Sequence, residues 1–156
     1  EIVNDAKLIL EVSGERIRIE LLRILSSDSA HEGVMLLKNA NLLNYIFPEL
    51  IEGIGISQKR PGRHHIDDVF THNVLSLKFC PSTDSIIRLA ALLHDVGKPK
   101  VMGKDDKGLV IFYNHEVAGA QIARNICDRL KFPKKERNKI VNLIPTPIPI
   151  YFSIVG

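Results

Sequence analysis

Residues 92–99 read Leu92-Leu93-His94-Asp95-Val96-Gly97-Lys98-Pro99 and are the most informative stretch of this chain. They close an apolar run with helical spacing, and Gly97 and Pro99 are typical of a helix end. On a regular helix the adjacent His94 and Asp95 would point about 100° apart. They can face one site only where the backbone turns. The stretch therefore predicts a helix end that carries a His-Asp pair.

A third candidate ligand, His72, precedes His94 by 22 residues. That separation fits a helix, a short turn and a second helix, and an antiparallel helix pair can bring both imidazoles together. Two imidazoles and a carboxylate suit a divalent metal such as Mn, Fe, Ni, Co or Zn, and Mg suits a carboxylate-rich position. Such a metal activates water and neutralises phosphate oxygens. We therefore predict that His72, His94 and Asp95 bind a divalent metal that acts on a phosphate ester.

Three further residues are candidates for the same site. His115, at an expected helix start, is either a ligand of a second metal bridged by Asp95 or a general acid toward the leaving oxygen. Lys98 is a candidate phosphate contact, the alternative being a solvated charge at a helix C-terminus. His65 lies seven residues before His72 and either lines the site or belongs to a loop. Asp95, His115 and Lys98 are thus the catalytic candidates.

The composition is that of an ordinary globular protein. The chain has 156 residues, 45% hydrophobic and 25% charged, with a net charge of +3 that is compatible with a polyanionic partner. Its length allows one domain, or one domain with a small helical appendage. Cys80 and Cys127 lack metal-type spacing and suit reduced thiols. With no apolar stretch long enough for a bilayer and no visible signal peptide, we expect a cytoplasmic protein without membrane contact.

Apolar spacing indicates an all-α chain. Helices are expected at residues 15–25, from residue 29 to beyond residue 37, and at residues 41–47, 67–79, 82–94, 115–130 and 133–144. An extended segment is expected at residues 109–112. The glycines and Pro61 of residues 53–66 indicate a loop. We divide the chain into a small helical neck (1–52), a linker loop (53–66), a helical domain (67–144) and a Pro-rich tail (145–156).

Several residues are expected to begin or end these helices. Ser29 and Glu32 fit a capping box, and Asp67 or Asp68 can cap the helix that carries His72. Ser82 or Thr83 can cap the helix that leads to His94. Two prolines complete the set: Pro48 is expected to stop the 41–47 helix, and Pro133 suits the first turn of the last helix.

These motifs together resemble a known family. Residues 65–72, 92–99 and 112–120 resemble the HD superfamily of metal-dependent phosphohydrolases, a fold made of a helical bundle. Residues 13–21 and 42–50 resemble the neck region of bacterial tRNA nucleotidyltransferases and poly(A) polymerases. The resemblance runs from about residue 13 to residue 144. It implies the ligands His72, His94 and Asp95, and a closing Asp for which the sequence offers no clear counterpart.

The resemblance also carries expectations about partners. In that family the neck helps to hold nucleotide and tRNA, which implies an RNA- or nucleotide-facing role for Arg16, Arg18 and Arg23; a solvated helix face is the alternative. The nucleotidyltransferase head has no counterpart in this sequence, so this chain alone is not expected to add nucleotides.

Two functions remain open at this point. The first is an HD phosphohydrolase module that hydrolyses phosphomonoesters or cyclic-nucleotide phosphodiesters. The alternative is a non-catalytic RNA-binding tail with a structural or vestigial metal site and with tRNA as its partner.

Overall fold

The computed structural model describes residues 5–59, 61 and 68–146 of the chain. His65 therefore lies outside the described residues. The elements are η1 (Ala6–Glu11), α1 (Gly14–Ser26), α2 (Ala30–Asn39), α3 (Leu43–Ile46), α4 (Pro48–Ile51), α5 (Val69–Lys78), α6 (Ser85–Leu93), α7 (Lys98–Val101), β1 (Met102–Lys104), β2 (Val110–Phe112), α8 (His115–Arg129) and α9 (Lys134–Leu143). The all-α prediction is confirmed, since the strands of the described part form one short hairpin.

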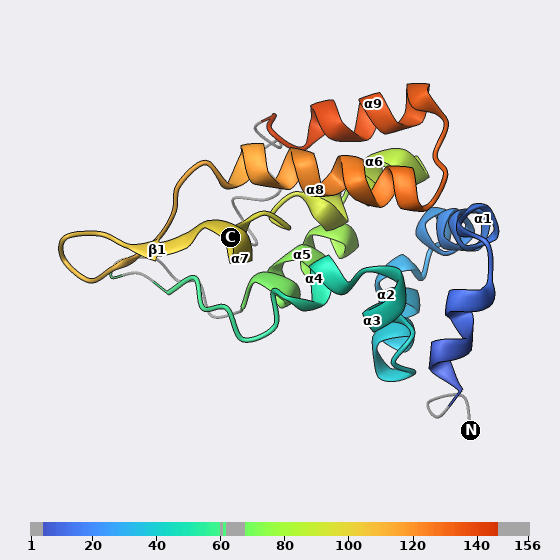
Figure 1. The fold of residues 1–156 in the computed structure, drawn as a ribbon, viewed down its shortest axis with the longest axis horizontal. Coiled ribbons are helices and arrows are strands. Elements are labelled where there is room, and N and C mark those ends of the chain that lie inside the picture. Colours follow the sequence, from blue (N-terminus) through green and yellow to red (C-terminus); the bar gives the residue numbers. More distant parts are fainter. Residues whose placement is uncertain (1–4, 60, 62–67, 147–156) are drawn as a thin grey trace.

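Helix α6 lies at the centre of the fold. Its sequence, Ser-Ile-Ile-Arg-Leu-Ala-Ala-Leu-Leu, is apolar on nearly every side, as expected of a helix surrounded by protein. It packs against α1, α5 and α9, and α9 also packs along α8. Figure 1 shows α8 and α9 side by side above α5, with α1, α2 and α3 at the opposite end from the hairpin. The His-Asp pair follows the end of this central helix.

One hydrophobic core joins the neck to the helical domain. Leu25 and Val34 of the neck lie in the same buried cluster as Leu89 and Ile126. Burying side chains of this size contributes about 1.5–3 kcal/mol each to the free energy of folding. The neck is therefore held rigidly against the helices that position the site.

Arginines strengthen this connection at three points. Arg88 of α6 donates to the carbonyl oxygens of Leu25 and Ser27, both 2.7 Å away, where the end of α1 leaves carbonyls without helical partners. Arg129 of α8 donates to the Ile46 carbonyl and pairs with Glu49. The third connection, made by Arg18 of α1, reaches Lys131 just past the C-terminal end of α8 and is described with the site below.

The helix starts agree with the sequence only in part. Asp68 accepts a hydrogen bond from the Thr71 amide at 2.7 Å and caps α5, as one of the two expected candidates. Helix α6 is capped by Asp84, whose carboxylate accepts from the Ile86 amide, so the prediction of Ser82 or Thr83 is wrong. A carboxylate is a stronger acceptor than a hydroxyl at the positive end of a helix. Ser29 does precede α2, but its side chain makes no capping hydrogen bond.

Other boundaries also differ from expectation. Pro48 begins α4 as well as ending the preceding segment, because a helix N-terminus needs no donor at that position. Helix α6 ends at Leu93, and the Lys98-Pro99 pair starts the separate short helix α7. The segment after α7 forms an antiparallel hairpin in which Gly103 pairs with Ile111. The 3-10 helix η1 has no counterpart among the expected elements.

No helix in the described ranges has the length and apolar character needed to cross a bilayer.

Candidate metal centre

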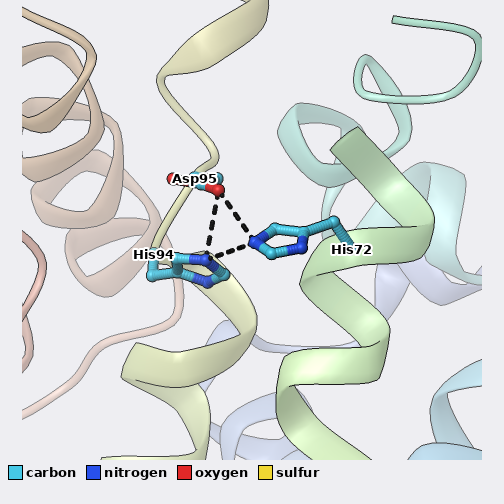
Figure 2. A group of neighbouring side chains, drawn as sticks. All are labelled: His72, His94 and Asp95. Atoms are coloured by element: carbon cyan, nitrogen blue, oxygen red, sulfur yellow. Dashed lines mark hydrogen bonds and ion pairs between the residues drawn. The ribbon is translucent and has the colours of Figure 1, made fainter. Parts of the chain in front are cut away.

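Three side chains converge at the end of α6. His72 projects from α5, and His94 and Asp95 follow the last turn of α6; Figure 2 shows the two imidazoles and the carboxylate pointing toward one another. The two histidine Nε2 atoms lie 3.1 Å apart. Asp95 Oδ2 lies 3.2 Å from His72 Nε2 and 3.1 Å from His94 Nε2. The predicted antiparallel helix pair and helix-end turn thus bring all three groups together.

Hydrogen bonds to the backbone hold this turn in place. The Asp95 amide donates to the side-chain oxygen of Asn73, the residue after His72, and Asn73 is buried. This contact ties the residue that carries the carboxylate directly to the helix that carries one imidazole. Asn73 therefore fixes the separation of α5 from the turn.

A close backbone approach fixes the turn on its other side. A Cβ atom at Gly97 would lie 2.5 Å from the Gly119 amide nitrogen and would also collide with the His115 carbonyl. Only glycine fits at this point, and the turn consequently lies directly against the first two turns of α8.

The hydrogen bonding of His94 prepares it as a ligand. Its Nδ1 lies 2.7 Å from the Ala91 carbonyl oxygen, which can only accept, so the proton of a neutral ring is on Nδ1. The lone pair then lies on Nε2, facing the other two groups. A backbone carbonyl that orients a ligand histidine in this way is a common feature of metal sites.

The three atoms have the separations that a metal ion requires. Separations of 3.1–3.2 Å are those of neighbouring octahedral vertices with metal–ligand bonds of about 2.2 Å. Three electron-pair donors this close repel one another unless a proton or a cation lies among them. Within the described part of the chain, His72, His94 and Asp95 are the group found with metal-binding geometry. The cluster fits a divalent metal.

The carboxylate has two further cationic or polar neighbours. Lys98 Nζ lies 2.9 Å from Asp95 Oδ2, the same oxygen that faces both histidines. His115 Nε2 lies 3.3 Å from the other oxygen, Oδ1, and its Nδ1 contacts the Phe112 carbonyl. Both candidates from the sequence therefore reach Asp95, from opposite edges of its carboxylate.

The protonation of the cluster follows from these contacts. Burial raises the pKa of Asp95. The charge that His94 carries when its ring is protonated, with hydrogen bonds from His115, His72 and His94, outweighs burial and holds this pKa well below its usual range. The hydrogen bond to Asp95 raises the pKa of His115 although burial opposes it. Asp95 is thus ionised and available as a ligand across the neutral pH range.

The arginines of α1 have three different surroundings. Arg18 donates to the Lys131 carbonyl and lies over the Phe132 ring, at 5.8 Å from its centroid. Arg23 pairs with Glu20 on the exposed side of α1, and Arg16 lines an apolar cavity of about 350 Å³ with Ile17 and Leu21. Arg18 is thus engaged within the protein, whereas Arg23 is on the surface.

Two residues of the site were missed by the sequence analysis. Gln58 is buried and its side-chain oxygen accepts from Lys98 Nζ, although it lies 40 residues away along the chain. No local pattern marks such a residue. Asn73 could have been found from the sequence. It follows a candidate ligand on a mostly apolar helix, where a buried polar side chain needs a hydrogen-bond partner.

Comparison with known proteins agrees with this geometry. A family model described as "HD domain" matches residues 69–146, which is half of the chain. The chain belongs to the HD-domain family. A second model, described as "Probable RNA and SrmB- binding site of polymerase A", matches residues 1–53. The resemblance of the neck and of the following helices is thus confirmed.

Curated relatives cover most of this HD-domain chain. It is 39% identical to the A-adding tRNA nucleotidyltransferase of Deinococcus radiodurans and 36% identical to the CC-adding tRNA nucleotidyltransferase of Thermus thermophilus, each over 135 residues and 83% of the chain. It is 33% identical to the Multifunctional CCA protein of Halorhodospira halophila over 81% of the chain. The chain spans about 30% of the length of these relatives.

Proposed function

We propose that this HD domain is a metal-dependent phosphohydrolase module whose substrate is a phosphomonoester or a cyclic-nucleotide phosphodiester. The observation that carries the proposal is the charge of the cluster. Asp95 supplies one negative charge, while Lys98 adds a positive charge at 2.9 Å. A divalent metal held by His72, His94 and Asp95 would leave a positive excess, which favours an anionic substrate such as phosphate.

A bound divalent metal supplies Lewis acidity toward phosphate oxygens and activates water for attack on phosphorus. The protein's own residues have the complementary tasks. His72 and His94 hold the metal through Nε2, with the His94 ring oriented by the Ala91 carbonyl. Lys98 steadies a phosphate oxygen through its ammonium group.

His115 is the candidate proton donor. The Phe112 carbonyl accepts from its Nδ1, and Asp95 Oδ1 faces its Nε2, so both ring nitrogens can carry protons. The hydrogen bond with Asp95 raises the pKa of His115, which favours the protonated ring. Giving the Nε2 proton to the leaving oxygen balances hydrolysis, in which water adds to phosphorus and the ester P–O bond breaks.

Asp95→Asn tests this function because it keeps the size of the side chain and removes the ligand charge. Metal content is measured by elemental analysis, and hydrolysis of p-nitrophenyl phosphate and bis(p-nitrophenyl) phosphate is measured with added Mn²⁺ or Ni²⁺. Asp128→Asn is the matched control, since Asp128 pairs with Arg137 away from the cluster. We expect Asp95→Asn alone to lose metal and turnover. Equal turnover in both variants would refute the proposal.

The comparisons favour one alternative function. Residues 1–53 match a model whose description names RNA binding, and the relatives are named as tRNA nucleotidyltransferases. The described residues also contain only one carboxylate in the metal cluster. Under this alternative, the chain is the RNA-supporting part of a tRNA-processing protein, and its metal centre is structural.

Binding of tRNA separates the two functions. The alternative predicts tRNA binding that weakens steeply with salt, because basic side chains replace counterions on the phosphate backbone. Arg23→Gln, on the exposed face of α1, should reduce the salt dependence of tRNA binding. Arg18→Gln is the comparison, because Arg18 already contacts the Lys131 carbonyl and the Phe132 ring within the protein. No detectable tRNA binding at low salt would exclude the alternative.

A further inference from the structure

Lys98 is held by three partners from three parts of the chain. Its Nζ lies 2.9 Å from Asp95 Oδ2, donates to the Gln58 side-chain oxygen and lies 5.3 Å from the centroid of the Phe112 ring. The side chain is only 15% exposed. A buried ammonium group with this many partners has a defined position, unlike a solvated lysine at a helix end.

The ammonium group and a metal ion require the same atom. Asp95 Oδ2 is the oxygen that faces both histidine Nε2 atoms, and it is also the oxygen that Lys98 contacts. A dication bound among these three atoms would lie within a few ångströms of the lysine charge. At such distances two cations repel strongly, even with the screening found inside proteins. Metal binding and the Lys98–Asp95 ion pair therefore oppose each other.

Gln58 gives the ammonium group a second acceptor. Gln58 is buried. The preceding residue, Ser57, forms an isolated antiparallel backbone bridge with Asp68, which caps α5. Its oxygen already accepts from Lys98, and the Phe112 ring face lies on the same group. Lys98 can thus leave Asp95 without becoming a buried cation that lacks partners.

We propose that Lys98 competes with the divalent metal for Asp95 Oδ2 and that Gln58 is the positioning residue that receives the displaced ammonium group. This inference rests on the metal centre of the proposed function and adds a regulation to it. Lys98 sets how tightly the metal is held, and metal binding in turn releases the ammonium group toward an incoming anion.

The two residues then have opposite effects on metal affinity. Lys98→Met removes the competing charge and is expected to tighten Mn²⁺ binding about tenfold to a hundredfold. Gln58→Leu removes the second acceptor, so the ammonium group depends more on Asp95 and Mn²⁺ binding weakens about threefold to tenfold. In the double variant the Gln58 effect vanishes, because its only route is through Lys98. General destabilisation would weaken binding in every variant.

The experiment is calorimetric titration of the full 156-residue chain with Mn²⁺ alone, in the absence of any phosphate compound. Lys100→Met is the matched control, because it removes the same charge from a lysine that pairs with Glu52 on the surface. Lys98→Gln provides a second neutral variant, and circular dichroism checks the fold of each protein. Tighter binding in both Lys98 variants, with Lys100→Met close to wild type, supports the inference.

Other outcomes separate this inference from the proposed function. If both Lys98 variants fold and bind Mn²⁺ as tightly as the wild-type protein or more weakly, the competition is overturned while the metal centre stands. Equal tightening in Lys100→Met also overturns it, because the effect would then come from net charge. Tighter binding without any phosphatase activity would support the competition and remove the hydrolase function. Absence of Mn²⁺ binding in every variant would overturn both.

Discussion

Gly97→Ala is the substitution for which the structure gives the sharpest prediction. An added Cβ would lie 2.9 Å from Gly119 Cα and 2.5 Å from the Gly119 amide nitrogen, and it would also collide with the His115 carbonyl. Carbon atoms in contact normally stay about 3.5–4.0 Å apart, so the turn and α8 must separate by on the order of 1 Å. All three obstacles are backbone atoms, which cannot turn aside as a side chain can.

The size of the effect follows from two opposing contributions. Overpacking of a close contact costs about 1–3 kcal/mol, and the upper end applies to backbone obstacles. Gly97 has φ −77° and ψ −17°, a conformation that alanine adopts readily, so reduced freedom of the unfolded chain returns about 0.4–1 kcal/mol. We expect a net loss of about 2 kcal/mol in the free energy of unfolding. For a chain of this length, that corresponds to a fall of about 4–8 °C in Tm.

Urea and thermal denaturation followed by circular dichroism measure this loss. Gly103→Ala is the matched control, because a Cβ there would meet only Ile111 Cγ1, at 3.9 Å. Separation of α8 should also draw His115 away from Asp95, and the hydrogen bond that raises the pKa of His115 would weaken. An NMR titration of His115 would then give a lower pKa. A Gly97→Ala protein as stable as Gly103→Ala would refute the reasoning.

Three further predictions concern the core and the helix ends. Arg88→Ala removes hydrogen bonds to three backbone carbonyls and should lower the free energy of unfolding by about 3 kcal/mol in urea denaturation, with Arg88→Lys recovering only part of the loss. Leu89→Ala leaves a cavity at a fully buried site and should cost about 2–5 kcal/mol by the same assay, whereas the exposed Leu36→Ala should stay within about 0.5 kcal/mol of wild type. Asp84→Ala should cost about 1 kcal/mol at pH 7. The hydrogen bond from the Ile86 amide lowers the pKa of Asp84 in the folded protein. The stability from its charge is therefore present above the unfolded pKa and disappears as pH falls through the folded pKa. Urea midpoints should show a smaller difference between wild type and Asp84→Ala at pH 3 than at pH 7, and an unchanged difference would contradict this.

The helix starts show how local sequence can mislead. Ser82, Thr83 and Asp84 are all good N-cap residues, and sequence alone does not rank three adjacent candidates reliably. The structure favours Asp84, and the Ser82 carbonyl instead accepts from Arg88 Nε. Asp68 was easier to anticipate because only one neighbouring residue competed with it.

The sequence by itself determined the helical class and the three side chains of the candidate metal centre. Apolar periodicity indicates the longer helices, and a His-Asp pair followed by Gly97 places two donor groups at a helix end. The 22-residue spacing from His72 matches a helix, a short turn and a second helix. These are local properties, which depend on neighbouring residues and on the geometry of a single helix pair.

Only the tertiary structure decided what surrounds the ligands. The contact of Lys98 with Asp95 and Gln58, and the internal position of Arg18, join residues up to 113 positions apart along the chain. The close approach of Gly97 to Gly119 likewise depends on how two helices pack. Such contacts follow from the relative placement of whole elements. That placement is set by the shared core, and no local pattern of residues encodes it.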